Sequence, residues 1–137
     1  MPKALALDPG DQHIGTALSD ELGMLAEPYQ TVTPETLDAF LGLIIPQEDI
    51  NTIVIGYPKT MRGTISAQTQ KSIDLKNTLA IKFPDLKLVL WDERLTSQSA
   101  AKLKKSTDKT SRLQQHSIAA AIILQTYLDS NYFVSEE

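Results

Sequence analysis

Two acidic segments that lie far apart in the chain have the residue types of a cation site. Asp8 ends a short apolar run, Lys3–Asp8, and Asp92-Glu93 ends a second run that begins at Leu86. Hard divalent cations such as Mg²⁺ take oxygen ligands and often share carboxylates with substrate phosphate oxygens. Two such ions can activate a water molecule and neutralise the departing oxygen when a phosphodiester is cleaved. The two segments therefore indicate metal-dependent phosphodiester chemistry if the fold brings them together.

Each acidic segment also has an ordinary structural interpretation. Asp-Pro-Gly is a common turn sequence, and Asp92-Glu93-Arg94 could form a surface ion cluster that contributes about 0–1 kcal/mol. Their joint placement at strand ends favours the cation site. Because successive strand residues point to opposite faces, Trp91 and Glu93 share one face and Asp92 takes the other. We expect Glu93 to be the acid that meets Asp8.

Basic residues are concentrated in one stretch of an otherwise acidic chain. The formal net charge is −4, which argues against wholesale, sequence-blind coating of nucleic acid. Between positions 102 and 112, however, a single acid, Asp108, accompanies five cations: Lys102, Lys104, Lys105, Lys109 and Arg112. Such a stretch is either a solvated connection or a clamp that contacts substrate phosphates without reading bases.

A second group of cations lies in the segment Gly56–Thr64, which follows a predicted strand and contains Lys59 and Arg62. A loop of this kind can place backbone N–H groups and a guanidinium against a phosphate. It is also what any long strand-to-helix connection needs. Trp91 and Tyr57 could stack on an unpaired base, although a core position beside the sheet is the simpler interpretation for Trp91.

Hydrophobic periodicity predicts the elements that must position these residues. Three short strands joined by turns form an antiparallel meander, and a helix follows with Leu37 and Ile44 on its apolar stripe. A strand, a helix, a strand and two helices complete the order βββαβαβαα. The predicted ranges are Lys3–Asp8, His13–Ser19, Met24–Val32, Asn51–Gly56, Ile65–Phe83, Leu86–Glu93, Leu95–Lys105 and Leu113–Leu128. On the helix of Ile65–Phe83 the predicted buried face carries Ile65, Ile73, Leu79, Ala80 and Phe83.

This order predicts an α/β domain with a mixed sheet and helices on both faces. Chemistry in open α/β sheets gathers at the carboxyl ends of strands, which here are Asp8-Pro9-Gly10, Gly56-Tyr57-Pro58 and Asp92-Glu93-Arg94. A chain of 137 residues with 42% apolar content suits a single domain spanning 1–137.

The composition also limits the classes of protein to consider. Cysteine is absent, which excludes disulfides and thiolate metal sites. The sequence has no run of 18 apolar residues and no organisation typical of a signal peptide, so we expect a cytoplasmic protein that does not enter the membrane.

Taken together, the motifs resemble those of a known bacterial family, the resolvase-like nucleases with an RNase H-like fold, to which maturation of the 5′ end of pre-16S rRNA is assigned. The similarity spans almost the whole chain in the family's order. Its motifs are Asp8-Pro9-Gly10, Ile14-Gly15, Ser19-Asp20, Gly56-Tyr57-Pro58 with Met61, Gly63 and Thr64, Asp92-Glu93-Arg94-Leu95-Thr96-Ser97, Ala119-Ala120, Ile123-Leu124-Gln125 and Tyr127-Leu128.

The resemblance implies cleavage of structured nucleic acid with Mg²⁺ or Mn²⁺, with acidic residues at the positions matched by Asp8 and Glu93. Asp92 would assist, and Lys59, Arg62, Arg94 and the basic stretch would contact nucleic acid. The resemblance is also compatible with a homodimer.

His116 is the largest departure from the family pattern, which has an Asp seven residues before the isoleucine of the Ile-Leu-Gln motif. An imidazole suits Mn²⁺ or transition metals better than Mg²⁺. It could contact a metal ion, hold a water molecule or transfer a proton. Alternatively, His116 is a packed residue at the start of an apolar helix that shares its face with Ala120 and Ile123.

A second departure lies at Gln12-His13, where the family usually carries basic residues beside the first catalytic Asp. Reduced positive charge there means weaker attraction for a phosphate. His13 is then either an ordinary hairpin residue or a substrate contact.

Three functions are compatible with this sequence. The first is a nuclease acting on pre-16S rRNA, with Asp8 and Glu93 holding metal ions, and the second is a Holliday junction DNA resolvase with the same chemistry. The third is a non-catalytic RNA-binding factor in ribosome assembly, which the substitution at His116 favours.

Overall fold

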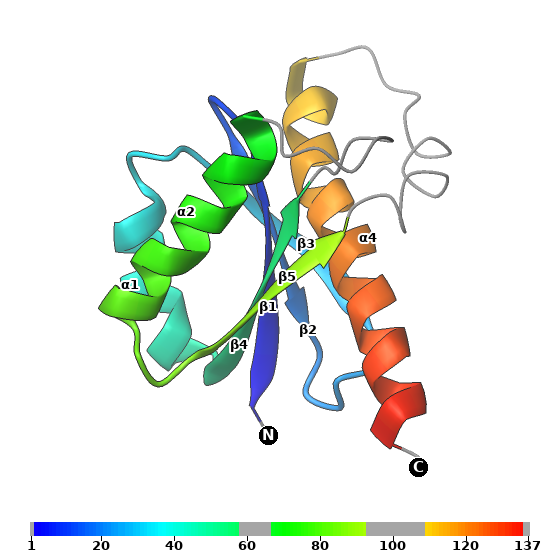
Figure 1. Cartoon of the computed structure of the whole chain (residues 1–137). Coiled ribbons are helices and arrows are strands. Elements are labelled where there is room, and N and C mark those ends of the chain that lie inside the picture. Colours follow the sequence, from blue (N-terminus) through cyan, green and yellow to red (C-terminus); the bar gives the residue numbers. More distant parts are fainter. Residues whose placement is uncertain (1, 58–66, 93–108, 136–137) are drawn as a thin grey trace.

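A single mixed sheet organises the protein, for which a computed structural model describes residues 2–57, 67–92 and 109–135 (Figure 1). Its strand order is β3-β2-β1-β4-β5. The strands are β1 (Lys3–Pro9), β2 (Ile14–Ser19), β3 (Ala26–Val32), β4 (Ile50–Tyr57) and β5 (Lys87–Asp92). The first three form the predicted antiparallel meander, and β1, β4 and β5 are parallel. The predicted α/β architecture with an antiparallel and a parallel side is confirmed.

Helices cover both faces of the sheet, as predicted. Helices α1 (Leu37–Gln47) and α2 (Ala67–Lys82) lie on one face, and α4 (Lys109–Ser135) crosses the other (Figure 1). Two buried clusters result, one on each face. We call them the α1/α2 cluster and the α4 cluster. None of the described helices is both long enough and apolar enough to span a membrane.

The side-chain alternation of β1 sorts its residues between these clusters. Leu5 and Leu7 belong to the α1/α2 cluster, whereas Ala4 and Ala6 belong to the α4 cluster. Asp8 continues the even-numbered series and so lies on the α4 face. The small side chains on this face leave room for α4 to lie close to the sheet.

The β2–β3 pair forms an outer side of the sheet and is joined across an irregular register. Thr16 bridges the irregularity, because its hydroxyl donates to the Gln30 carbonyl at 2.5 Å and accepts from the Gln30 N–H at 2.9 Å. Strand β3 also contains Pro28, which lacks a backbone donor. An edge strand tolerates that loss, because one of its sides faces no neighbouring strand.

The last helix is longer than predicted. It begins at Lys109 and ends at Ser135, whereas the apolar stripe predicts only Leu113–Leu128. Polar residues extend a helix without adding to its hydrophobic pattern, so periodicity alone places both ends too far inward. The end of the basic stretch is therefore the first turn of α4. The helix predicted over Leu95–Lys105 lies outside the described residues.

The buried side of α2 also differs from the prediction. Leu79 is buried and Ile73 half-buried, but Ala80 is exposed, whereas Thr69 and Ser72 are buried. The Ser72 hydroxyl donates to the Gly56 carbonyl at 3.0 Å. This hydrogen bond satisfies a polar group that a search for apolar residues would assign to the solvent side.

Candidate active site

The carboxyl ends of the three parallel strands meet at one edge of the sheet. Strand β1 ends at Pro9, and Tyr57 at the end of β4 pairs in register with Asp92 at the end of β5. The N-terminal part of α4 stands beside this edge (Figure 1). The edge is where open α/β sheets carry their chemistry.

Asp8 lies at this edge on the α4 face, and its side chain is half-buried. The turn that follows it is tied to the opposite layer of the protein, because Asp11 forms an ion pair with Lys71 of α2. In the antiparallel register Asp8 faces Gly15 of β2. The position of Asp8 is therefore fixed from two sides, by its neighbouring strand and by the anchored turn.

Helix α4 approaches the sheet most closely at Gly15. A β-carbon added to Gly15 would lie 1.9 Å from the carbonyl oxygen of His116 and 2.9 Å from the N–H nitrogen of Ser117. Only a glycine leaves space for the helix backbone at this point. Since Gly15 is the register partner of Asp8, this contact brings His116 to the same part of the α4 face.

His116 is half-buried, and its ring lies against the ring of His13. The two ring centroids are 5.3 Å apart, with an angle of 29° between the planes. Burial, together with the nearby His13, lowers the pKa of His116 below its ordinary value, because the charged form loses hydration. The neutral imidazole is therefore favoured at neutral pH.

His116 lies two turns into α4. The sequence had instead indicated a position at the start of this helix. Ala120 and Ile123, four and seven residues further along the helix, belong to the α4 cluster. The packing role and the metal or proton-transfer role of His116 both stay predictions, and they do not exclude each other.

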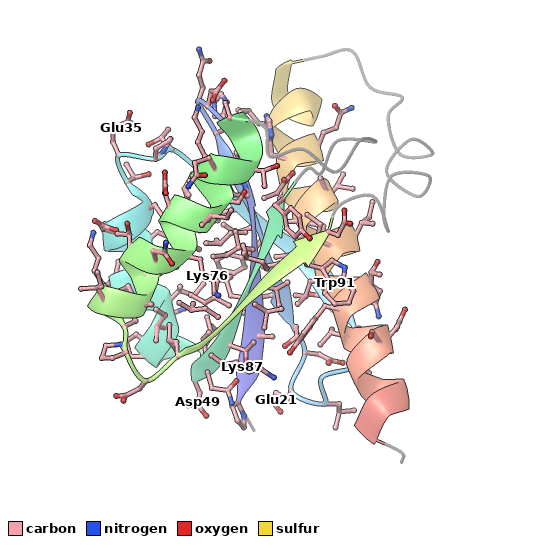
Figure 2. The ribbon with its side chains drawn as sticks, in the orientation of Figure 1. Glu21, Glu35, Asp49, Lys76, Lys87 and Trp91 are labelled. Carbon is pink, nitrogen blue, oxygen red and sulfur yellow. The ribbon has the colours of Figure 1, made fainter. Side chains whose placement is uncertain are left out.

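Trp91 has the predicted core position. Its ring lies on the α4 side of β5 (Figure 2). It contacts Tyr127 of α4 edge to face, with centroids 5.6 Å apart and an angle of 89°. Its indole N–H is buried and has no hydrogen-bond partner among the residues that the structure describes. Leu88 and Leu90 of the same strand pack on the α1/α2 cluster, so alternation directs Asp92 to that face. Asp92 therefore lies on the face opposite Asp8.

Most of the predicted nucleic-acid contacts cannot be placed. Glu93, the second predicted metal ligand, lies outside the described residues, as do Lys59, Arg62, Arg94, Lys102, Lys104 and Lys105. Lys109 and Arg112 belong to the first turn of α4. Within residues 2–57, 67–92 and 109–135, no three His, Asp or Glu side chains are close enough together to hold a metal ion.

Two residues at or near the site gain roles that the sequence analysis did not assign. His13 contacts His116, and no local sequence pattern signals this contact. Gln125 of the Ile-Leu-Gln motif binds the β2–β3 connection: its Nε2 donates to the Met24 carbonyl at 2.8 Å, and its Oε1 accepts from the Ala26 N–H at 2.9 Å. Gln125 thus holds α4 in place along the sheet.

Comparison with known proteins gives a consistent result. A family model described as "RuvX: Holliday junction resolvase" matches residues 2–130. A protein of Geobacillus kaustophilus (strain HTA426), named "Putative pre-16S rRNA nuclease", is 38% identical over 136 residues, which cover 93% of this chain and 98% of the relative. A protein of the same name from Onion yellows phytoplasma (strain OY-M) is 43% identical over 134 residues, covering 92% of this chain and 88% of the relative.

A solved structure supports the fold. The RuvC protein of T. thermophilus, in complex with a Holliday junction substrate, superposes with a TM-score of 0.59 at 13% sequence identity, and 96% of each chain is covered. At this identity the likeness concerns the fold alone, which is the RuvC-like form of the RNase H fold. Together with the family match over residues 2–130 and the whole-length relatives, it shows that the chain belongs to the RuvX family.

Proposed function

We propose that this protein is a metal-dependent nuclease that processes the 5′ end of pre-16S rRNA. The observation that carries the proposal is the position of Asp8. It ends the central strand of an RNase H-like sheet and shares a face with His116 of the helix that crosses that strand. The names of the relatives support the choice of substrate.

The donors available at this edge suit a divalent cation. Asp8 offers carboxylate oxygens, which Mg²⁺ and Mn²⁺ prefer, and His116 offers an imidazole nitrogen, which suits Mn²⁺ better. Asp8, Glu93 and His116 would hold the ions, which when bound would activate water and neutralise the leaving oxygen. Asp92, at the end of β5 and on the opposite face of the sheet from Asp8, would assist only indirectly.

The protein's own residues supply the rest of the chemistry. Lysines and arginines of the basic stretch, with Lys59, Arg62 and Arg94, would bind substrate phosphates and fix the register of the strand. A neutral His116 beside the reacting edge can accept a proton or orient a water molecule. Trp91 packs between β5 and Tyr127 of α4.

Replacing Asp8 by Asn tests the proposal. The amide keeps the shape of the side chain but loses the negative charge that attracts a cation. We expect Asp8→Asn to reduce cleavage of a labelled pre-16S leader by about 100-fold or more, with Mg²⁺ or Mn²⁺ present, while the protein remains folded. Asp74→Asn, at an exposed position of α2, is the matched control and should retain full activity.

Cleavage of a Holliday junction is a second candidate, favoured by the description of the family model. Discrimination between the two substrates would depend on contacts with the RNA 2′-OH. Cleavage of the pre-16S leader and of a four-way DNA junction, measured side by side, separates the two functions. Unchanged turnover of Asp8→Asn on both substrates would remove Asp8 from the active site.

A non-catalytic role in ribosome assembly is the third candidate, and His116 is the observation behind it. In that case the wild type would bind RNA but cleave neither substrate with either metal. His116→Asp would then acquire cleavage, because it restores the acid of the family pattern.

A further inference from the structure

The two histidines of the chain lie in contact with each other. The ring centroids of His13 and His116 are 5.3 Å apart. Nothing in the sequence connects these positions, which are 103 residues apart by number (116 minus 13). The fold joins them where α4 passes over Gly15.

We propose that His13 and His116 together form a two-imidazole site for a transition-metal ion of the Zn²⁺ or Co²⁺ type, at the edge that carries Asp8. The proposal deepens the proposed function, on which it rests for the use of the metal, by adding a ligand and by specifying the class of metal. Imidazole nitrogen favours Zn²⁺, Co²⁺ and Mn²⁺, whereas Mg²⁺ prefers oxygen.

The separation of the rings suits a shared ion. Imidazole nitrogens bind Zn²⁺ at about 2.0–2.1 Å, so two rings on one tetrahedral ion have centroids roughly 5 Å apart. The observed 5.3 Å is close to this separation. The rings are stacked in the structure, with an angle of 29° between their planes, so a shared ion requires the rings to turn. Rotation about χ2 is soft for histidine and would turn the ring nitrogens toward one point.

The two rings remain accessible to solvent. Both side chains are half-buried, so a metal ion in solution can reach the pair. Each ring lies against the other.

The strand register places an oxygen ligand nearby. Ile14 packs on the α1/α2 cluster, so alternation puts both His13 and Gly15 on the α4 face, where Asp8 faces Gly15. As described, the three side chains do not form a ready cluster. The two imidazoles are therefore the ligands of the proposed site, with water molecules completing the coordination.

The composition of the chain makes this site unusually simple to test. His13 and His116 are its only histidines, and it has no cysteine. We suggest titrating the full-length protein with Zn²⁺, without substrate, and following both imidazoles by ¹H–¹⁵N correlation NMR, with calorimetry for affinity. The expected result is one Zn²⁺ per chain and simultaneous shifts of both rings.

Variants distinguish a shared site from simple ring packing. His13→Gln and His116→Gln should each weaken Zn²⁺ binding by about ten-fold or more, whereas Asp74→Asn should not change it. If Zn²⁺ shifts only one ring in the wild type, or if His13→Gln binds Zn²⁺ as tightly as the wild type, the proposal is wrong and His13 is a packing residue.

The outcome is separable from that of the proposed function. A protein that binds Zn²⁺ through both rings but cleaves no nucleic acid would retain this site and lose the nuclease assignment. A protein that cleaves with Mg²⁺ but binds no Zn²⁺ would retain the nuclease assignment and lose this site.

Discussion

His116 illustrates how a single residue can have both a packing role and a chemical one. Its ring continues the apolar face formed by Ala120 and Ile123, yet it lies at the edge of the sheet beside His13. Partial burial of an ionisable group carries an energetic consequence that can be measured apart from catalysis, because the folded and unfolded states then bind protons with different affinity.

The pKa of His116 predicts a pH dependence of stability. Burial and His13 lower this pKa in the folded state, so as the pH falls through the ordinary value near 6.5 the unfolded state takes up a proton first. The free energy of unfolding should therefore fall over this range and level off below the folded-state pKa. We expect His116→Gln to lose this pH-dependent part of the free energy of unfolding. The variant should therefore gain stability relative to the wild type as the pH falls.

Urea unfolding at about pH 7.5 and about pH 5 measures the effect. The informative quantity is the difference between variant and wild type at each pH, since carboxylates titrate equally in both proteins. If that difference is the same at the two pH values, His116 has no depressed pKa in the folded protein.

At the scale of elements, the contact between α4 and β2 determines the shape of the site. Gly15 allows the helix backbone to lie against the strand at His116, and Gln125 binds the β2–β3 connection nine residues further along the helix (125 minus 116 by number). These two contacts fix where His116 stands relative to Asp8.

Gly15→Ala should be strongly destabilising. The added methyl group would lie 1.9 Å from a backbone oxygen, which cannot move without displacing α4. We expect a loss of about 1–3 kcal/mol or more in the free energy of unfolding. Gly42→Ala is the matched control: Gly42 is exposed on α1 with no heavy atom within 4 Å of the added carbon, so this change should stabilise the protein by about 0.4–1 kcal/mol. Equal effects of the two substitutions in urea unfolding would contradict the close approach.

Gln125→Ala should loosen the end of α4 that lies over the β2–β3 connection. The variant loses two hydrogen bonds to backbone groups, at Met24 and Ala26, and leaves the partly buried Ala26 N–H without its partner. We expect a cost of about 1 kcal/mol and faster amide exchange at Ala26. Gln114→Ala, at an exposed position of the same helix, serves as the control. If the two variants are equally stable, the hydrogen bonds of Gln125 contribute little to the free energy of unfolding.

The elements were largely predictable because their patterns are local. Alternation and β-branched runs identify the strands, and the strand ends place Asp8 at the edge of the sheet that carries the candidate site. The N-terminal extension of α4 was missed because Lys109–Arg112 adds no apolar periodicity, and the buried Ser72 because its partner, Gly56, lies on another element. The contact of His13 with His116 depends on the packing of α4 against β2, which no local pattern encodes.

At the scale of the whole molecule, charge is distributed unevenly. The chain has a formal net charge of −4, but five of its thirteen lysines and arginines fall between Lys102 and Arg112. The last part of this stretch, Lys109–Arg112, is the first turn of α4, beside the edge that carries Asp8. An acidic body with cations beside its reactive edge would attract a phosphate backbone mainly to that edge.

Neutralising Lys104, Lys105 and Lys109 together, each by Gln, should weaken nucleic-acid binding on all sequences alike. Each lost phosphate contact removes the release of a counterion, so the slope of log K against log salt should flatten by about one unit per contact. The control replaces Lys76, Lys82 and Lys87 by Gln, which changes the net charge by the same amount. Lys82 ends α2, and Lys76 of α2 and Lys87 at the start of β5 are labelled in Figure 2. A salt slope that is unchanged in the first variant, or altered equally in both, would show that the basic stretch is only a connection and that overall charge governs binding.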